Sequence, residues 1–546
     1  MKRFLPFVVP FTIAVLVTTR PAETIGPAND GGDKAIVHVL NRIAFGPRPG
    51  DVERVRAMGI DRYIDQQLHP QRVADPGMAA RLSDLASIGM SSREIAREYE
   101  LPQLEARRQR KQNSGPDQAG EPPKPDPRLQ KANGVIVELA QQKVLRAIYS
   151  ERQLQEVLTD FWFNHFNVDA RKGRDRFLLT EYERETIRPR VLGTFRDLLE
   201  ATAKSPAMLF YLDNWLSADP NGPHMEMLPP RVARGPFDGR VVPGTEVGRR
   251  FGRPPQGKNA PKGLNENYGR ELMELHTLGV DGGYTQKDVT EVARAFTGWT
   301  IDNPRQGGGF TFNPRLHDTG QKVVLGHVIK AGGGESDGEQ VLDILAKEPA
   351  TARVIATKLA RRFVSDTPPP ALVDRAAKRF QATDGDLREV TRTILTSPEF
   401  LAAESYRAKV KTPFEFVVSA ARALGADVQD ALPLVRQLQQ LGMPLYQCQP
   451  PTGYKDTADA WVDTGALVNR MNFALTLASG RMRGIALDFP QLGDDDDGRR
   501  TAASRGVVTR VLSSEASETT RAAIEKAPSA AQMTAYALAS PEFQQK

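Results

Sequence analysis

The side chains best placed to do chemistry in this sequence are His165, Glu271, His317 and Asp318. Imidazole and carboxylate groups can ligate a metal ion that keeps an open position for water, or act as acid and base without a metal. We therefore predict His165, Glu271 and Asp318 as catalytic residues. We also predict a possible divalent metal bound by His165, Glu271 and His317.

Glu271 stands in the segment 264–279, "LNENYGRELMELHTLG". At about 100° per residue, the helix places its leucines on one apolar arc, and Glu271 falls inside that arc. Glu274 falls at the edge of the arc, and His276 falls on its other border. Because a buried carboxylate left alone is costly, Glu271 must meet a partner. The residues expected to support the site from around it are Asn164, Asn267, Arg270, Glu274 and His276.

His165 ends the segment "LQEVLTDFWFNHF" and shares one helical stripe with Leu154, Leu158 and Phe161. This spacing predicts that His165 points inward, whereas Asp160 and Asn164 lie off the stripe. A purely structural alternative stays open at this point. In it, Glu271 pairs with Arg270 or Arg294, and His165 donates to a backbone carbonyl.

Short catalytic signatures give no further help. The patterns HExxH and GxxxxGK[ST] are absent, as is GxGxxG followed by a helix, which disfavours zinc proteases of that type and nucleotide-binding proteins. Cys448 is the single cysteine, so an intramolecular disulfide and a cysteine-rich zinc site are excluded.

The elements that must hold these residues are mostly helices. Helical periodicity from about residue 34 onward predicts a mainly α fold, a large single helical domain over 34–546. One or two short β-hairpins are expected in "GFTFN" and "KVVLGHVI". Two Pro-, Gly- and charge-rich stretches, at about 104–131 and 228–262, predict long irregular exposed inserts.

The net charge of the chain and its first residues indicate which partners it binds and where in the cell it is located. The net charge of +6 is too mild to indicate nucleic acid, so no nucleic-acid partner is expected. Lys2 and Arg3 precede an apolar run, which predicts a signal peptide over 1–22 and export to the periplasm or beyond. An uncleaved anchor is the alternative. After cleavage, no transmembrane helix is expected.

Several blocks resemble the bacterial domain of unknown function 1800 family, notably "LTDFWFNHFNV" at 158–168 and the long block 263–300 from "GLNENYGREL" to "FTGWT". The resemblance covers nearly all of the chain after the leader. It implies an exported, largely helical protein, with a possible partner from a neighbouring sulfatase-like exported family. The positions that match the family's polar motifs are Asn164, His165, Asn265, Glu266, Asn267, Arg270, Glu271, Glu274, His276, His317 and Asp318.

Two functions follow as hypotheses. The first is an envelope hydrolase that acts on a polysaccharide or another anionic polymer through the His/Glu/Asp site. The second is a non-catalytic envelope scaffold or secretion partner, in which the same polar residues form a buried network. An envelope protein is then the expected partner.

Overall fold

The structure is a computed structural model that describes residues 32–113, 126–222, 263–487 and 497–546. The predicted signal peptide and the predicted insert at 228–262 lie outside these residues. The described chain is mainly α-helical, as the periodicity predicted. Within it, no helix combines the length and the apolar composition needed to cross a bilayer.

The helices of the first half of the described chain begin at residue 33. Those before residue 223 are α1 (Asp33–Ile43), α2 (Asp51–Met58), α3 (Ile60–Leu68), α4 (Met78–Arg81), α5 (Ser92–Ile95), α6 (Leu101–Asn113), α7 (Pro127–Tyr149), α8 (Gln153–His165), α9 (Leu179–Glu181), α10 (Phe195–Ala203) and α11 (Pro206–Tyr211).

Helices of the second half continue to the last residues. They are α13 (Glu266–Glu271), α14 (Gln286–Ala295), α15 (Glu335–Lys347), α16 (Pro349–Phe363), α17 (Pro370–Ala382), α18 (Leu387–Leu395), α19 (Pro413–Ala423), α20 (Leu432–Gln440), α21 (Thr464–Ala478), α22 (Asp497–Leu512), α23 (Glu518–Lys526), α24 (Ala530–Ala539) and α25 (Pro541–Gln544).

Three wider turns of π-helix interrupt the regular helices: η3 (Ala96–Glu100), η5 (Tyr182–Ile187) and η9 (Leu272–Thr277). In a π-turn the backbone bonds span five residues, so the side chains fall out of the 100° spacing of an α-helix. This matters for η9, because it continues α13 through the segment that carries the predicted Glu271 site.

The strands form three small antiparallel pairs. β1 (Trp299–Ile301) pairs with β2 (Phe310–Phe312), and β3 (Lys322–Val324) pairs with β4 (His327–Ile329). The sequence predicted strands at β2, β3 and β4. The third pair, β5 (Asp427–Val428) with β6 (Ile485–Ala486), was not predicted, because strands of two residues are too short to show a period of two.

Local signals explain where several helices begin. Thr285 and Asp288 form the predicted capping box at the start of α14. The predicted irregular insert at 104–131 is partly wrong, because α6 extends to Asn113 and α7 begins at Pro127, whose N-cap Asp126 accepts from the amide of Arg128. α6 packs against α7 and η3, and this packing orders a segment whose own composition is polar.

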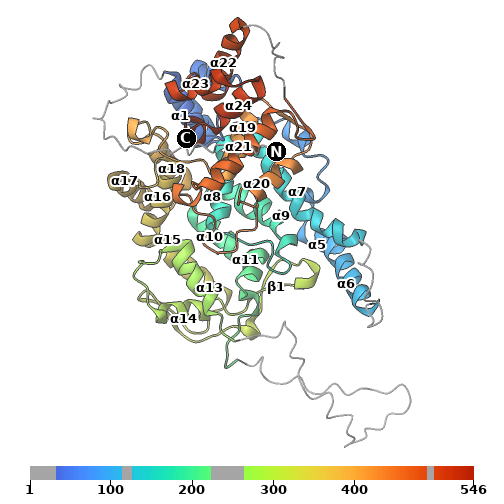
Figure 1. The fold of residues 1–546 in the computed structure, drawn as a ribbon. Helices are drawn as coiled ribbons and strands as arrows, with labels where there is room; N and C mark the ends of the chain where they lie inside the picture. The colour runs from blue at the N-terminus through green and yellow to red at the C-terminus, as the bar shows by residue number, and fades with distance from the viewer. Residues whose placement is uncertain (1–31, 114–125, 223–262, 488–496) are drawn as a thin grey trace, which may run out of the picture.

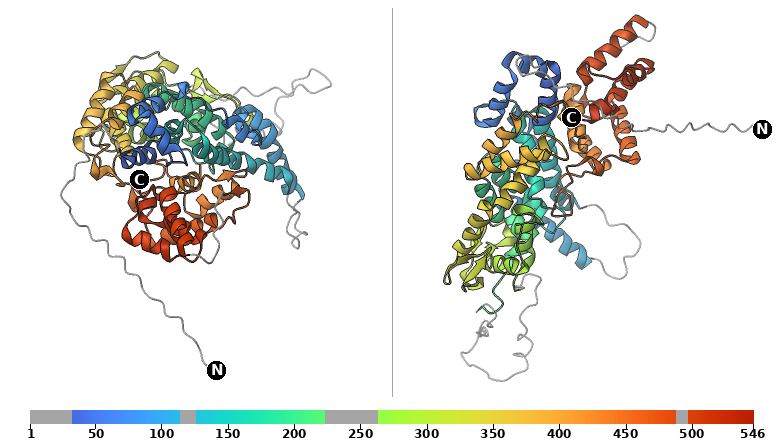
Figure 2. Two further views of the ribbon diagram at one scale, coloured as in Figure 1. Left: turned by 90° about the horizontal axis from the view of Figure 1, so that it is seen from above. Right: turned by 90° about the vertical axis from the view of Figure 1, so that its left-hand side faces the viewer.

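One core runs through nearly the whole chain, from Ile36 in α1 to Phe543 in α25. Figures 1 and 2 show α21–α25 gathered as a layer beside the body that the earlier helices form, with α1 at the same end of the molecule. α13 and α14 lie at the opposite end (Figure 1). The long segment between α20 and α21 runs back across the body and contacts α8, which creates the pocket described next.

Candidate functional site

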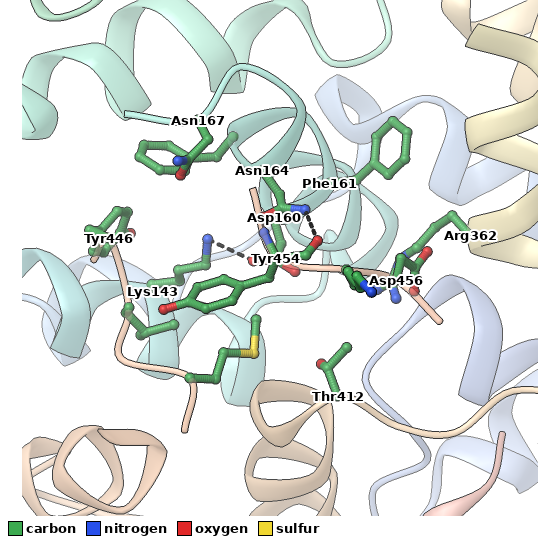
Figure 3. A pocket seen from close by; sticks show the side chains of 14 residues that line it. Lys143, Asp160, Phe161, Asn164, Asn167, Arg362, Thr412, Tyr446, Tyr454 and Asp456 are labelled. Atoms are coloured by element: carbon green, nitrogen blue, oxygen red, sulfur yellow. Dashed lines mark hydrogen bonds and ion pairs between the residues drawn. The ribbon is translucent and has the colours of Figure 1, made fainter. Parts of the chain in front are cut away.

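A pocket lies where α8 meets the segment between α20 and α21 (Figure 3). We call it the Asp160 pocket. Its volume is about 60 Å³, which is room for a few water-sized groups, such as the polar end of a larger ligand. It is lined by Lys143, Asp160, Phe161, Phe163, Asn164, Asn167, Arg362, Thr412, Met443, Leu445, Tyr446, Tyr454, Lys455 and Asp456.

α8 supplies the polar wall of the pocket. Asp160 and Asn164 stand one helical turn apart, so they share a face, and that face is the one lying off the buried stripe of His165. Lys143 reaches in from α7, and its Nζ lies 2.8 Å from Asp160 Oδ1. The pocket therefore opens onto an ion pair that is largely screened from water.

A second set of charges lines another part of the pocket. Arg362, from α16, is 5% exposed and pairs with the buried Glu415. Asp456 faces Lys409, with 3.4 Å between Oδ1 and Nζ. Arg362 Nε and Asp456 Oδ2 are both buried and have no hydrogen-bond partner among the described residues. An orphaned donor and an orphaned acceptor are thus present in the same lining.

Asn164 fixes the opposite wall through two hydrogen bonds to the backbone of Tyr454. Its side-chain amide donates to the Tyr454 carbonyl at 2.8 Å, and its Oδ1 accepts from the Tyr454 amide at 2.7 Å. Asn167, one turn further, donates to the carbonyls of Cys448 and Pro450, each at 2.9 Å. The two asparagines therefore hold the 446–454 stretch against the C-terminal end of α8.

A buried ionic network supports the pocket from below. Tyr446 donates to Glu183 at 2.6 Å, and Arg188 bonds both Glu183 and Glu156. Burial raises the pKa of Glu183, but Lys143 and Arg188 outweigh burial and hold this pKa below its usual value. Glu183 lies in the π-turn η5 and stays ionised beneath the pocket.

His165 points inward as predicted, and its side chain is buried. Its Nδ1 lies 2.9 Å from Lys358 Nζ, and its Nε2 lies 3.1 Å from the carbonyl oxygen of His276. Burial, followed by Lys358 and His276, lowers the pKa of His165 well below 6.5. The neutral ring therefore accepts from Lys358 and donates to the carbonyl, as the structural alternative expected.

Glu271 does not point into the core as predicted. It is half-buried at the end of α13, and burial together with the neighbouring Glu274 raises its pKa. The π-turn η9 explains the error, because it shifts the residues after Glu271 out of the assumed spacing. His276, expected at a border, is instead fully buried beside Phe166, and Leu275 is only half-buried.

His317 and Asp318 have separate structural partners. His317 Nδ1 lies 2.8 Å from the Thr297 carbonyl oxygen, and its Nε2 lies 3.2 Å from Asp337, a carboxylate that also binds Lys322. Asp318 forms a two-pronged ion pair with Arg294, at 2.7 and 3.0 Å. Burial raises the pKa of Asp318, but Arg294, the Gly320 amide and Lys322 together outweigh burial and lower it.

The predicted metal set His165, Glu271 and His317 is therefore not brought together. Each of the two histidines is bonded to its own set of neighbours, and Glu271 has neither of them as a partner. Across the described ranges, no three His, Cys, Asp or Glu side chains gather in a way that could hold a metal ion. The expectation of one shared site is therefore wrong, because His165, Glu271 and His317 lie in three separate environments.

The residues predicted to support that site divide between surface, core and pocket. Asn267 is exposed and His276 is buried, whereas Arg270 donates to Gln286 at 2.6 Å and Glu274 accepts from Tyr284 at 3.1 Å. The contacts of Arg270 and Glu274 connect α13 and η9 with α14 and the residues just before it. Asn164 alone lies in a pocket.

Sequence reasoning missed the charged lining of the pocket. Lys143 could have been noticed, because it stands one turn after Leu139 on the buried face of α7. Asp160 gave a signal too, since it shares the off-stripe face with Asn164. Tyr454 and Asp456 lie in an irregular segment without periodicity, so no spacing argument places them.

These features define a class: a large α-helical protein with a small polar pocket built over a buried ionic network. Residues 38–545 match the family described as "Protein of unknown function (DUF1800)", so the chain belongs to that family. No curated protein and no solved structure matches the chain in the comparisons.

Proposed function

We propose that the protein is exported and recognises the polar end of an envelope polymer in the Asp160 pocket. The observation that carries this proposal is the joint placement of ion-paired Asp160, the orphaned Asp456 Oδ2 and the aromatic ring of Tyr454 in one small cavity (Figure 3). Ligand sites combine apolar walls with a few convergent polar groups, and sugar rings suit this mixture of ring faces and planar acceptors.

Export is supported by the leader-like residues 1–22, which lie outside the described part of the chain. Fractionation of cells that produce the full chain tests it. The expected result is a processed protein outside the cytoplasm with a new N-terminus near residue 22, and an unprocessed cytoplasmic protein would contradict the export proposal.

A hydrolytic activity would use different residues from those the sequence pointed to. Asp160 and Asp456 are the carboxylates that reach this cavity, whereas His165, His317 and Asp318 are occupied by structural partners. We therefore assign any bond cleavage to the two aspartates of the pocket. Release of reducing ends from envelope polysaccharide is the assay.

The binding test compares the mature protein with Asp160→Asn by isothermal titration against acidic and neutral oligosaccharides. The substitution keeps the shape and removes the charge, and a hydrogen bond to a charged group contributes about 1.5–3 kcal/mol. Wild type is expected to bind at least one of these oligosaccharides about ten-fold or more tightly than the folded variant, because a ligand hydroxyl that donates to Asp160 loses its charged acceptor in the variant. Equal binding by both proteins, or none by wild type, would overturn the proposal.

A second candidate is a non-catalytic scaffold or secretion partner. It is favoured by the extent of the buried network, in which Arg188 bonds both Glu183 and Glu156 under the pocket. For this candidate, Asp160→Asn restores the phenotype of a strain that lacks the gene as fully as wild type does. Failure of the folded variant to restore it would favour the pocket.

A further inference from the structure

A group of buried cations lies beside the Asp160 pocket, and we call it the basic cluster. Its members come from four parts of the chain: α1, α16, the stretch before α19, and α21. Each is 5% exposed or less. The members are Arg42, Arg362, Lys409, Lys411 and Arg470.

The carboxylates near this cluster are too few to balance it. Among the described residues, Glu415, Asp366 and Asp456 form ion pairs with its members, and Asp160, which also acts on Arg362, is itself paired with Lys143. Five basic side chains against these three carboxylates leave an excess of two basic groups. Buried charge that lacks a counter-charge costs several kcal/mol.

Three members have no carboxylate within 4 Å among the described residues. Arg42 donates to the carbonyl of Ser405 while its Nε and Nη1 have no partner. Arg470 donates to the Lys411 carbonyl at 2.8 Å. Lys411 Nζ lies 3.9 Å from the ring centre of Phe543. Burial lowers the pKa of Lys411 to about 7, as expected for an amine without a counter-ion.

The cluster meets the pocket at Arg362. This guanidinium pairs with Glu415 on one side, while its Nε is buried without a partner in the pocket lining. Lys455 stands on the same lining with a side chain that is 71% exposed. An anionic group in the pocket would therefore accept from Arg362 Nε and would also be attracted by the excess positive charge of the basic cluster behind Arg362.

Asp456, unlike Arg362, requires a hydrogen-bond donor on the ligand. Its Oδ2 is an acceptor without a donor, in the same lining as Arg362. A sulfate or phosphate group would bring only more negative charge toward this oxygen. A ligand carboxylate flanked by hydroxyl groups suits both Arg362 and Asp456, because the carboxylate accepts from Arg362 and a hydroxyl donates to Asp456.

We infer that the Asp160 pocket takes the acidic edge of a sugar acid, a hydroxylated ring that carries a carboxylate, with the carboxylate at Arg362 and a hydroxyl at Asp456. This inference rests on the proposed function and names its ligand class. The same chemistry is found in a free sugar acid and at the end of an acidic polysaccharide.

Galacturonate and galactose make a matched pair of probes, because they differ only in the carboxylate that replaces a CH₂OH group. Isothermal titration of the mature protein at constant ionic strength is expected to show galacturonate binding at least ten-fold more tightly than galactose. Sodium sulfate is expected to bind more weakly than galacturonate. A galacturonate trimer distinguishes the sources, since tighter binding of the trimer than of the monomer indicates a polymer end.

Two substitutions locate the effect. Lys455→Met removes an exposed cation of the lining and is expected to weaken galacturonate binding several-fold without a change in melting temperature. Lys411→Met removes an uncompensated buried charge, so it is expected to raise the melting temperature without ligand and to weaken galacturonate binding. The exposed Lys378, exchanged in the same way, is the control and should change neither quantity.

The outcomes separate this inference from the proposed function. Equal affinity for galactose and galacturonate, with loss of both in Asp160→Asn, would overturn the sugar-acid assignment and leave the pocket as a binding site. Sulfate binding as tightly as galacturonate would also overturn the assignment, because it would show no need for hydroxyl groups. Absence of binding by every probe counts against both proposals.

Discussion

The contact between Asn164 and Gly453 sets the shape of the pocket at the scale of single residues. Gly453 has a φ of +73°, and a Cβ added there would lie 2.3 Å from the Asn164 carbonyl oxygen and 2.6 Å from its Oδ1. Only a residue without a side chain lets the Tyr454 backbone approach α8 closely enough for the two hydrogen bonds of Asn164.

Gly453→Ala is therefore expected to break the two hydrogen bonds between Asn164 and the Tyr454 backbone. The matched control is Gly442→Ala, because Gly442 has a similar φ of +84° but no atom within 4 Å of an added Cβ. Both changes incur the cost of a left-handed alanine, about 1–2 kcal/mol. Gly453→Ala should lower the free energy of unfolding by about 2 kcal/mol more, since two hydrogen bonds are lost. Equal losses of unfolding free energy for the two variants in urea denaturation would show that these hydrogen bonds do not depend on Gly453.

Buried histidines predict how stability depends on pH. Burial lowers the pKa of His38 to about 3, with Arg42 as a further cause, and that of His276 to about 3, with Lys358 as a further cause. The pKa of His165 is lowered as well. Between pH 3 and 6.5 the unfolded chain therefore binds more protons than the folded protein. Stability rises with pH across this window, and it is lost as the pH falls below about 6.5.

The measurement is urea denaturation between pH 4.5 and 7. Each of these histidines contributes a slope of up to about 1.4 kcal/mol per pH unit. His276→Phe keeps an aromatic ring beside Phe166 and should reduce the slope. His327→Gln, at an exposed position, should leave it unchanged. An unchanged slope in His276→Phe would show that His276 is not held neutral by burial.

At the scale of elements, regular spacing decided which predictions succeeded. The 100° rule placed His165 inside because α8 is an uninterrupted α-helix, and the capping box at Thr285 marked the start of α14. The same rule failed for Glu271, because η9 is a π-turn and no residue type signals such a turn. Lys143 and Asp160 left a detectable pattern, whereas Tyr454 and Asp456 are placed by contacts distant in sequence.

Packing of α13 on α14 depends on Gly269. A Cβ at this position would lie 2.9 Å from the Val289 carbonyl oxygen and 3.2 Å from the Ala293 amide nitrogen, so Gly269→Ala must push the helices apart. We expect a loss of about 1–3 kcal/mol in the free energy of unfolding, the usual cost of overpacking.

Gly134→Ala in α7 is the control for this substitution, because nothing lies within 4 Å of its Cβ. There alanine should stabilise the helix by up to about 1 kcal/mol. Opposite signs for the two glycines in chemical denaturation are the expected result. A stabilising Gly269→Ala would mean that the two helices are not in close contact.

For the whole molecule, the charges divide into balanced and unbalanced groups. Arg188 and Arg146 balance Glu183 and Glu156 under the pocket, and Asp318 pairs with Arg294 near the hairpins. The basic cluster keeps an excess of buried basic groups, and its member Arg362 lines the same pocket. We therefore expect ligand recognition at α8 and the 443–456 segment rather than at the segment 264–279.

Hydrogen–deuterium exchange with and without galacturonate tests that central claim most directly. Slower exchange is expected in residues 158–167 and 443–456, with no change in 264–279 or around His317, and galactose should have a smaller effect. Protection confined to 264–279 and the His317 region, with none in the pocket segments, would contradict the claim and return the site to the residues that the sequence suggested.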